Sequence, residues 1–107
     1  MEAVNLFEQY VKLIEKIGPI TIEPKKTSIS FLVRVRFGGA TIRKDYLEAR
    51  LWLRRDVKHP TLRRTEKVTA RDFVHYFRIQ SAEDMDKDFV PLLREAYAIG
   101  KQEHLKK

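Results

Sequence analysis

The sequence predicts an α+β fold in which an antiparallel sheet of four to five strands carries an N-terminal and a C-terminal helix on one face. Three observations lead to this prediction. Apolar residues recur with helical spacing at both ends of the chain, polar and apolar residues alternate in the middle, and short turn signals separate the alternating runs. Short connections between consecutive strands favour an antiparallel meander. The length of 107 residues fits one domain, 1–107.

The first element is a predicted amphipathic helix that ends at Gly18 and Pro19. Its apolar residues recur every three or four positions, and charged residues fill the opposite face. Glycine favours the end of a helix, and proline cannot continue one. The apolar stripe consists of Ala3, Phe7, Tyr10, Val11, Ile14 and Ile17.

After Pro19 the spacing at which apolar residues recur changes from about 3.6 residues, typical of a helix, to two, typical of a strand. Residues 20–22 form a short predicted strand that ends at Pro24, and residues 28–36 form the next one. We place a hairpin turn at residues 37–40, because the glycines there tolerate the positive φ angles that such turns need. Residues 41–43 are then the returning strand.

A turn at Asp45 and Tyr46 leads into the next predicted strand, residues 49–54, in which apolar and polar side chains alternate. Residues 55–70 are mostly polar and are interpreted as a long basic loop. The last predicted strand, residues 73–79, places Phe73, His75, Phe77 and Ile79 on one face and Val74, Tyr76 and Arg78 on the other.

The predicted C-terminal helix begins after Ser81, which with Asp84 resembles an N-terminal capping pair. Pro91 either kinks this helix or begins a second helical piece near Asp88. Gly100 is the predicted C-cap, and residues 101–107 are expected to be a frayed tail. The apolar stripe is Met85, Phe89, Leu92, Leu93, Ala96 and Tyr97.

Charge is unevenly distributed along the chain. The formal net charge is +7, and residues 25–78 hold 15 Lys or Arg against 5 Asp or Glu. The two flanks are mildly acidic. A basic centre suggests an anionic partner such as nucleic acid or a phosphorylated ligand, whereas the alternative is a surface that only aids solubility.

Composition excludes several classes of protein. There are no cysteines, so a disulfide framework and a thiolate metal site are excluded. No apolar run approaches the ~20 residues that span a bilayer, and the first residues do not resemble a signal peptide. We expect a cytoplasmic protein without membrane association, and no cofactor is predicted.

Several segments together resemble a prokaryotic family, domain-of-unknown-function family 5655, some members of which are labelled "predicted transport protein". The resemblance covers roughly residues 7–97 and rests on residues 24–31, 37–40, 51–53, 79–86 and 92–97. It implies a helix–sheet–helix α+β fold and no established chemistry. Members often have a Gly-rich, Trp-containing stretch before the last strand, which residues 65–70 replace here.

The sheet face opposite the predicted core is the first candidate binding surface. Arginines with interspersed aromatic rings are typical of proteins that bind single-stranded nucleic acid, because bases stack on the rings and guanidinium groups pair with phosphate. A regular pleat would place these residues there: Arg34, Arg36, Arg43, Arg50, Trp52, Arg54, Tyr76 and Arg78.

The basic segment 55–71, with Arg63 and Arg64, is the second candidate binding surface. We expect it to flank the arginine-rich face. It either clamps a phosphate backbone or is a solvated loop without a ligand. Two alternatives to nucleic-acid binding stay open for the arginine-rich face. It is a solvated surface whose arginines pair with Asp45, Glu48 or Asp72, or it is the interface of a homodimer or protein-interaction domain.

An enzyme is the third hypothesis. His75 is its sole candidate, and the pattern favours a core histidine over a catalytic base. Asp84, Asp86 and Asp88 lie at a helix start, where they are expected to cap the helix, and no metal site is predicted.

Overall fold

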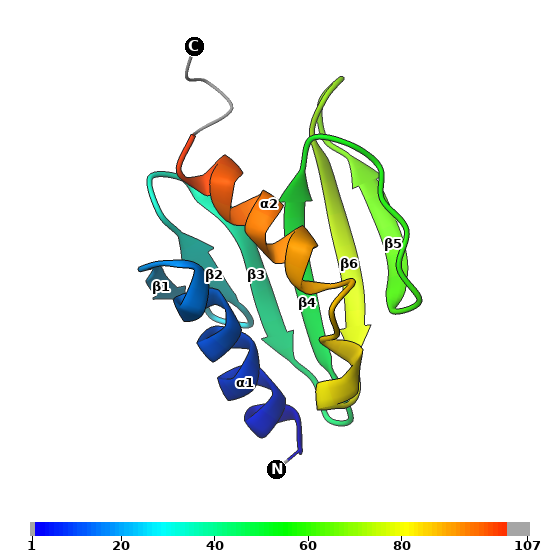
Figure 1. Ribbon diagram of the computed structural model, residues 1–107. Coiled ribbons are helices and arrows are strands. Elements are labelled where there is room, and N and C mark those ends of the chain that lie inside the picture. Colours follow the sequence, from blue (N-terminus) through cyan, green and yellow to red (C-terminus); the bar gives the residue numbers. More distant parts are fainter. Residues whose placement is uncertain (1, 103–107) are drawn as a thin grey trace.

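The structure, a computed structural model, describes residues 2–102, in which two α-helices cover one face of a six-stranded antiparallel sheet (Figure 1). The predicted fold class is confirmed, with six strands in place of four to five. The helices are α1 (Glu2–Ile17) and α2 (Val90–Gly100), and the short 3₁₀ helix η1 (Ala82–Asp84) precedes α2. The strands are β1 (Thr21–Pro24), β2 (Ile29–Leu32), β3 (Arg36–Ile42), β4 (Leu47–Leu53), β5 (Leu62–Lys67) and β6 (Phe73–Ile79).

The strands follow the order β1-β2-β3-β4-β6-β5, and every neighbouring pair is antiparallel. The first four strands form the predicted meander. The chain then passes from β4 to β5 at the outer edge, and β6 returns between them. β4 and β6 therefore pair directly, although the chain forms β5 between them.

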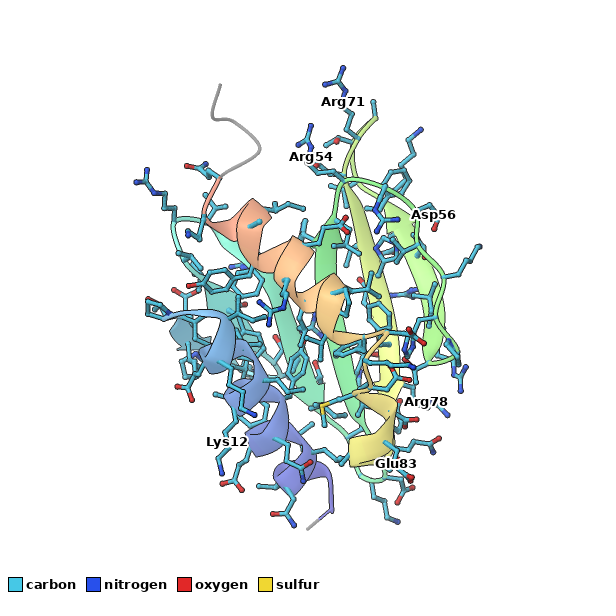
Figure 2. All side chains as sticks on the ribbon, in the orientation of Figure 1. Lys12, Arg54, Asp56, Arg71, Arg78 and Glu83 are labelled. Carbon is cyan, nitrogen blue, oxygen red and sulfur yellow. The ribbon has the colours of Figure 1, made fainter. Side chains whose placement is uncertain are left out.

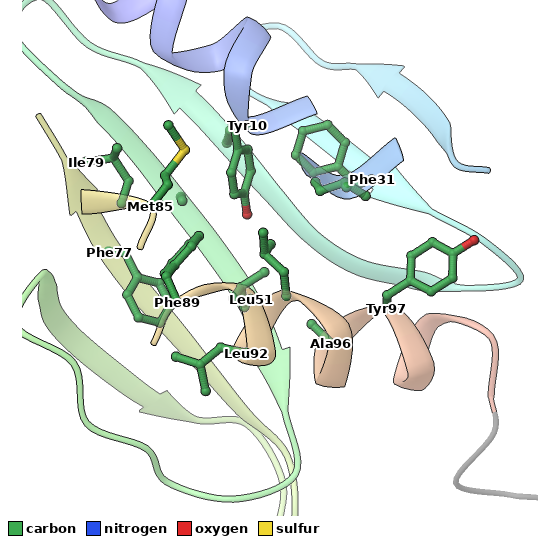
Figure 3. Close-up of a cluster of buried hydrophobic side chains, with 14 of the residues drawn as sticks. Tyr10, Phe31, Leu51, Phe77, Ile79, Met85, Phe89, Leu92, Ala96 and Tyr97 are labelled. Atoms are coloured by element: carbon green, nitrogen blue, oxygen red, sulfur yellow. The ribbon is translucent and has the colours of Figure 1, made fainter. Parts of the chain in front are cut away.

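The hydrophobic core lies between the helices and the sheet (Figure 3). On β4 the side chains of Leu47, Ala49, Leu51 and Leu53 are all buried, as strict alternation requires. The helices add aromatic and aliphatic side chains, and each large apolar side chain buried in this way contributes roughly 1.5–3 kcal/mol. The buried apolar residues of the helices and of the segment before α2 are Leu6, Tyr10, Ile14, Met85, Phe89, Leu92, Leu93, Ala96 and Tyr97.

The hairpin turn predicted at residues 37–40 is wrong, because these residues lie inside β3. The chain turns at residues 33–35 instead, where the N–H groups of Arg34 and Val35 donate to the carbonyl oxygen of Gly100. Neither Gly38 nor Gly39 has a positive φ. A Cβ atom on Gly38 would lie 2.6 Å from the carbonyl oxygen of Arg50, so glycine is needed here for the close approach of β4.

Residues 55–70 are also not one long loop, because β5 occupies Leu62–Lys67. At the other helix the second alternative for Pro91 is confirmed, since Pro91 lies in the first turn of α2. Gly100 is the last residue of α2, and Lys101 is its C-cap. Of the predicted frayed tail, residues 103–107 lie outside the described residues.

Candidate nucleic-acid interface

The sheet face opposite the helices carries the side chains that alternate with the core residues along the strands. We call it the open face. On β4, Glu48, Arg50 and Trp52 alternate with buried side chains. The register of β4 with β6 places Glu48 opposite Arg78 and Arg50 opposite Tyr76. Residues paired across antiparallel strands point to the same side, so these five side chains share the open face.

Arg50 lies near the middle of the open face and is tied down by its neighbours. Its guanidinium group donates to Thr41 Oγ1 at 2.8 Å and to Glu48 Oε1 at 3.2 Å. Its side chain is 15% exposed. Arg43, just beyond β3, approaches the same carboxylate at 3.7 Å. Arg50 is therefore a structural part of the face, and a ligand reaches it less easily than it reaches the other arginines.

Two further arginines form ion pairs at the ends of strands. Arg36 lies 3.8 Å from Glu23, whose pKa is lowered mainly by the hydrogen bond from Lys25. Arg54 donates to Asp72 at 3.2 Å. Figure 2 shows Arg54 and Arg78 near opposite ends of the sheet. The carboxylates thus neutralise much of the basic charge toward β1 and beside Arg54.

Arginine–tyrosine stacking replaces ion pairing where the open face reaches β6 and β5. The guanidinium carbon of Arg64 lies 4.1 Å from the centroid of the Tyr76 ring. Arg78 stacks in the same way on Tyr46, at 4.2 Å. Arg63 donates weakly to the backbone at 3.5 Å. Among the described residues, none of these three arginines forms an ion pair.

The Tyr76 hydroxyl donates to Glu66 Oε1 at 2.7 Å, which fixes the ring on which Arg64 stacks. Partial burial is the main cause that raises the pKa of Tyr76, and the bond to Glu66 adds to it. A shallow depression of about 60 Å³ separates the two arginine–tyrosine pairs. It is lined by Tyr46, Glu48, Arg63, Tyr76, Phe77 and Arg78. We call Arg63, Arg64, Arg78, Tyr46 and Tyr76 the Arg–Tyr cluster.

Comparison with protein families gives a match over residues 2–100, to the family described as Domain of unknown function (DUF5655). The chain belongs to this family. No curated protein and no solved structure matched the chain. Neither α1 nor α2, the α-helices of the described part of this DUF5655 chain, has both the length and the apolar character that crossing a bilayer requires.

The structure of the DUF5655 chain brings together some of the residues in the predicted site and separates others. Arg50, Trp52, Tyr76 and Arg78 share the open face, as the alternation predicts, and β5 carries Arg63 and Arg64 beside them. Arg36, Arg43 and Arg54 lie at or just beyond strand ends and form ion pairs. Arg34 lies in the turn between β2 and β3, away from any strand.

Sequence reasoning missed Tyr46 and Glu66 as members of this surface. Tyr46 was taken as part of a turn, and Glu66 as part of a loop. The alternation of Arg64 and Glu66 was the available signal for β5, but no apolar residues alternate with them to make it visible.

The side chains of His59 and His75 are both buried inside the fold of the DUF5655 chain. His75 is fully buried, and its ring packs near those of Phe73 and Phe77. Its Nε2 atom accepts the N–H of Val57 at 3.2 Å. Burial lowers the pKa of His75, and the carboxylate of Asp56 opposes this effect. A substrate has no access to a ring in this position, so the catalytic role considered for His75 loses its basis.

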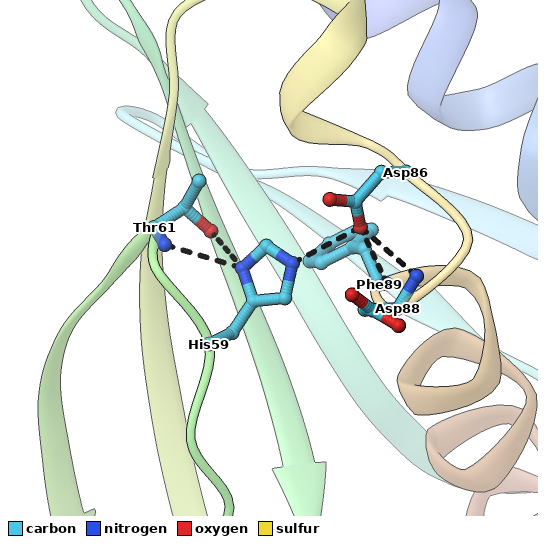
Figure 4. A network of polar contacts seen from close by, with 5 residues as sticks. All are labelled: His59, Thr61, Asp86, Asp88 and Phe89. Atoms are coloured by element: carbon cyan, nitrogen blue, oxygen red, sulfur yellow. Dashed lines mark hydrogen bonds and ion pairs between the residues drawn. The ribbon is translucent and has the colours of Figure 1, made fainter.

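His59 belongs to a polar network that the sequence did not reveal (Figure 4). Its Nδ1 atom contacts Thr61 Oγ1 at 2.8 Å, and Nε2 contacts Asp86 Oδ1 at 3.2 Å. The His59 side chain is 2% exposed. Asp86 also accepts the N–H groups of Asp88 and Phe89 at the start of the helical segment. The network therefore joins the segment before β5 to the segment before α2. Asp86 caps the start of the helical segment, as the sequence predicted, because its carboxylate accepts the N–H groups there.

Proposed function

We propose that this DUF5655 domain is a non-enzymatic module that binds single-stranded nucleic acid through the open face of β4, β6 and β5. The observation that carries the proposal is the Arg–Tyr cluster. Among the described residues its three arginines have no carboxylate partner, and Arg64 and Arg78 are held by stacking on tyrosine rings. A stacked arginine keeps N–H donors for an anion while the ring fixes the orientation of its guanidinium group.

The cluster suits phosphate, and the neighbouring rings suit bases. A guanidinium group that stacks on tyrosine still presents donor edges to a phosphate. Trp52 is half-buried on β4, two residues along from Arg50, and offers a ring for stacking. Stacking of a base on an aromatic side chain contributes roughly 1–3 kcal/mol. Together these groups match the combination of basic and aromatic side chains found in single-strand binding surfaces.

The paired arginines have a supporting role in this proposal. Arg36, Arg43 and Arg54 each lie within 4 Å of a carboxylate oxygen, so a phosphate would compete with an existing ion pair. Exposed ion pairs of this kind contribute only about 0–1 kcal/mol, and a phosphate can replace the carboxylate. We therefore place the strongest contacts at the Arg–Tyr cluster and weaker ones along β3 and β4.

Fluorescence polarisation with labelled single-stranded DNA and RNA of about 12 nucleotides tests the proposal, at low and at physiological salt. The double substitution Arg64→Glu with Arg78→Glu should weaken binding by about tenfold or more at low salt. Trp52→Ala should weaken binding by about five- to a hundredfold, as expected for one lost stack. Lys26→Glu, in the exposed turn between β1 and β2, is the control for the reversal of one charge and should have little effect.

Absence of binding at low salt would refute the proposal. If Lys26→Glu lowers the affinity as much as Arg64→Glu alone or Arg78→Glu alone, the binding is non-specific attraction by net charge. Light scattering separates the alternative of a homodimer, because a dimer that Trp52→Ala dissociates would assign the open face to a second copy of the chain.

A further inference from the structure

The edge of the sheet at β1 lies at the far side from the Arg–Tyr cluster. β1 is the first strand in the sheet order, and within residues 2–102 it pairs with β2 alone. All four of its residues, Thr21–Pro24, are exposed. An edge strand presents unpaired backbone groups that an extended chain can use for pairing.

The hairpin register identifies which backbone groups of β1 point outward. The N–H of Lys25 donates to the carbonyl oxygen of Ser28 at 2.7 Å, so these two residues form a hydrogen-bonded pair. Hydrogen-bonded and non-hydrogen-bonded pairs alternate along an antiparallel ladder. Ile22, paired with Phe31, is therefore in a non-hydrogen-bonded position. Its N–H and carbonyl groups point away from β2, toward the open edge.

An apolar groove follows this edge on the helix side of the sheet. Phe7 and Val11 of α1 line it together with Ile22 of β1, and its volume is about 300 Å³. The Ile22 side chain is 40% exposed. A strand added beside β1 would direct every second side chain toward this groove, because side chains alternate between the two faces of a strand.

Charged residues of α1 form the rim of the groove. Glu8, Lys12 and Glu15 line it above the apolar floor. Neither Glu8 nor Glu15 forms an ion pair with another described residue. Two free carboxylates and one ammonium group favour a ligand with basic residues at its ends.

We propose that the β1 edge binds an extended segment of a partner protein by β-strand addition. The segment has aliphatic residues at alternate positions, which enter the groove between α1 and β1, and Lys or Arg at its ends, opposite Glu8 and Glu15. Its backbone pairs with the outward N–H and carbonyl groups of Ile22. This is the mode in which backbone hydrogen bonds supply affinity and side-chain pockets supply specificity.

The opposite edge of the sheet is protected against such pairing. β5 carries Arg63, Arg64, Glu66 and Lys67, and charged residues on an edge strand discourage the addition of another strand. β1 has a single charge in its four residues, Glu23, and its proline, Pro24, lacks an outward N–H only at its own position, which leaves that of Ile22 open to an added strand. The difference between the edges favours β1 as the docking edge. The site is also separate from the Arg–Tyr cluster, so the proposal does not depend on nucleic-acid binding.

NMR titration with the capped peptide Lys-Thr-Val-Thr-Val-Thr-Val-Thr-Lys, whose lysines and valines share one face of the strand, tests the proposal. Saturable shifts should centre on β1 and on α1 near Val11. Exchange of the Ile22 N–H with solvent should slow by about tenfold at ten times Kd, because the free form then falls to about a tenth. A peptide of the same composition with its three valines adjacent should bind more weakly by about tenfold or more.

Two substitutions and one control complete the test. Ile22→Pro removes the outward N–H without removing a bond to β2, and Val11→Lys places a charge in the groove; each should weaken peptide binding by about tenfold or more. Lys67→Pro makes the matching change at the β5 edge, since the bond from the Val68 N–H to Asp72 places Lys67 in an outward position too. This control should keep the affinity within about twofold. The NMR spectrum of each variant verifies its fold.

Equal affinity for both peptides, or for Ile22→Pro and the folded Lys67→Pro control, would overturn the proposal. So would slow exchange of the Ile22 N–H in the free protein together with a dimeric mass, because a second copy would then cover the edge. Oligonucleotide binding by Ile22→Pro should equal that of the unmodified chain, which keeps this result distinct from any failure of the proposed function.

Discussion

His59 Nε2 lies 3.2 Å from Asp86 Oδ1, and this contact joins the segment before β5 to the turn before α2. The other ring nitrogen of His59 accepts the N–H of Thr61 at 3.2 Å. A nitrogen that accepts a hydrogen bond carries no proton, so Nε2 is the protonated nitrogen that donates to Asp86. The same carboxylate oxygen accepts the N–H groups of Asp88 and Phe89, each at 3.0 Å.

Asp86→Ala is expected to lower the unfolding temperature, because it removes the acceptor of these three bonds. The hydrogen bond from His59 is the main cause that lowers the pKa of Asp86 from 3.8. A carboxylate with a lowered pKa stabilises the folded state above its unfolded pKa, and this contribution is lost as the pH falls below it. The stability difference from the variant should therefore be full at pH 7 and at pH 5 and smaller at pH 3.

Thermal unfolding at those three pH values measures the difference. Asp88→Ala is the matched control, since it removes a neighbouring exposed carboxylate. A variant of Asp86 that loses no more stability than the Asp88 control would contradict the role given to the network.

Gly100→Ala is expected to destabilise the fold. A Cβ atom on Gly100 would lie 2.6 Å from Cδ1 of Phe37 and 3.0 Å from its Cβ. Overpacking of this kind costs about 1–3 kcal/mol, which outweighs the roughly 0.8–1.0 kcal/mol that alanine gains over glycine in a helix. Urea unfolding measures the free energy. Combining the change with Phe37→Leu should cost less than the sum of the two single changes, and strict additivity would show that no clash occurs.

β4 and the core face of β6 were predictable, because burial on one face leaves a clear pattern. β4 alternates buried and half-buried residues, and β6 places Phe77 and Ile79 on the core face with His75, as predicted, although Val74 on its other face is buried as well. The central strand β3 was missed, because its glycines were interpreted as a turn. β5 was missed because it is an edge strand whose side chains are mostly exposed. A strand of this kind needs few apolar residues, so its sequence is indistinguishable from a polar loop.

The glycine pair shows a second limit of sequence reasoning. Glycine marks positions of positive φ and also positions where two backbones approach closely, and the sequence does not distinguish these causes. The side-chain contacts of the candidate site were also not predictable from the sequence. Alternation predicted that Arg50 and Arg78 share a face, but it did not predict their partners. The strand register places Glu48 opposite Arg78, yet Glu48 bonds to Arg50 on its own strand, and Arg78 stacks on Tyr46 instead.

Burial of His75 predicts a pH-dependent stability between pH 7 and pH 5. Burial, the main cause, lowers the pKa of His75 from 6.5. The unfolded chain then binds a proton below pH 6.5 that the folded chain does not, so the free energy of unfolding falls as the pH falls. One such group contributes at most about 1.4 kcal/mol per pH unit. Below the pKa that His75 has in the folded state, both states bind the proton, so the free energy of unfolding stops falling on account of His75.

His75→Gln removes the titrating group and should flatten this part of the pH profile. The variant is expected to be less stable at pH 7, because Val57 loses the ring nitrogen that accepts its N–H. Urea unfolding of both proteins at half-unit pH intervals provides the comparison. Parallel profiles would mean that other groups cause the pH dependence.

Salt dependence measures how many arginines of the Arg–Tyr cluster contact phosphate. For a single strand, the logarithm of the binding constant falls against the logarithm of the salt concentration with a slope of about −0.7 per neutralised phosphate. Arg63, Arg64 and Arg78 together predict a slope of about −2. Arg78→Ala should bring it closer to zero by about 0.7 for any base sequence. Trp52→Ala should weaken binding at every salt concentration with the slope unchanged, because stacking releases no counterions. A slope that responds to Trp52→Ala but not to Arg78→Ala would place the phosphates elsewhere on the chain.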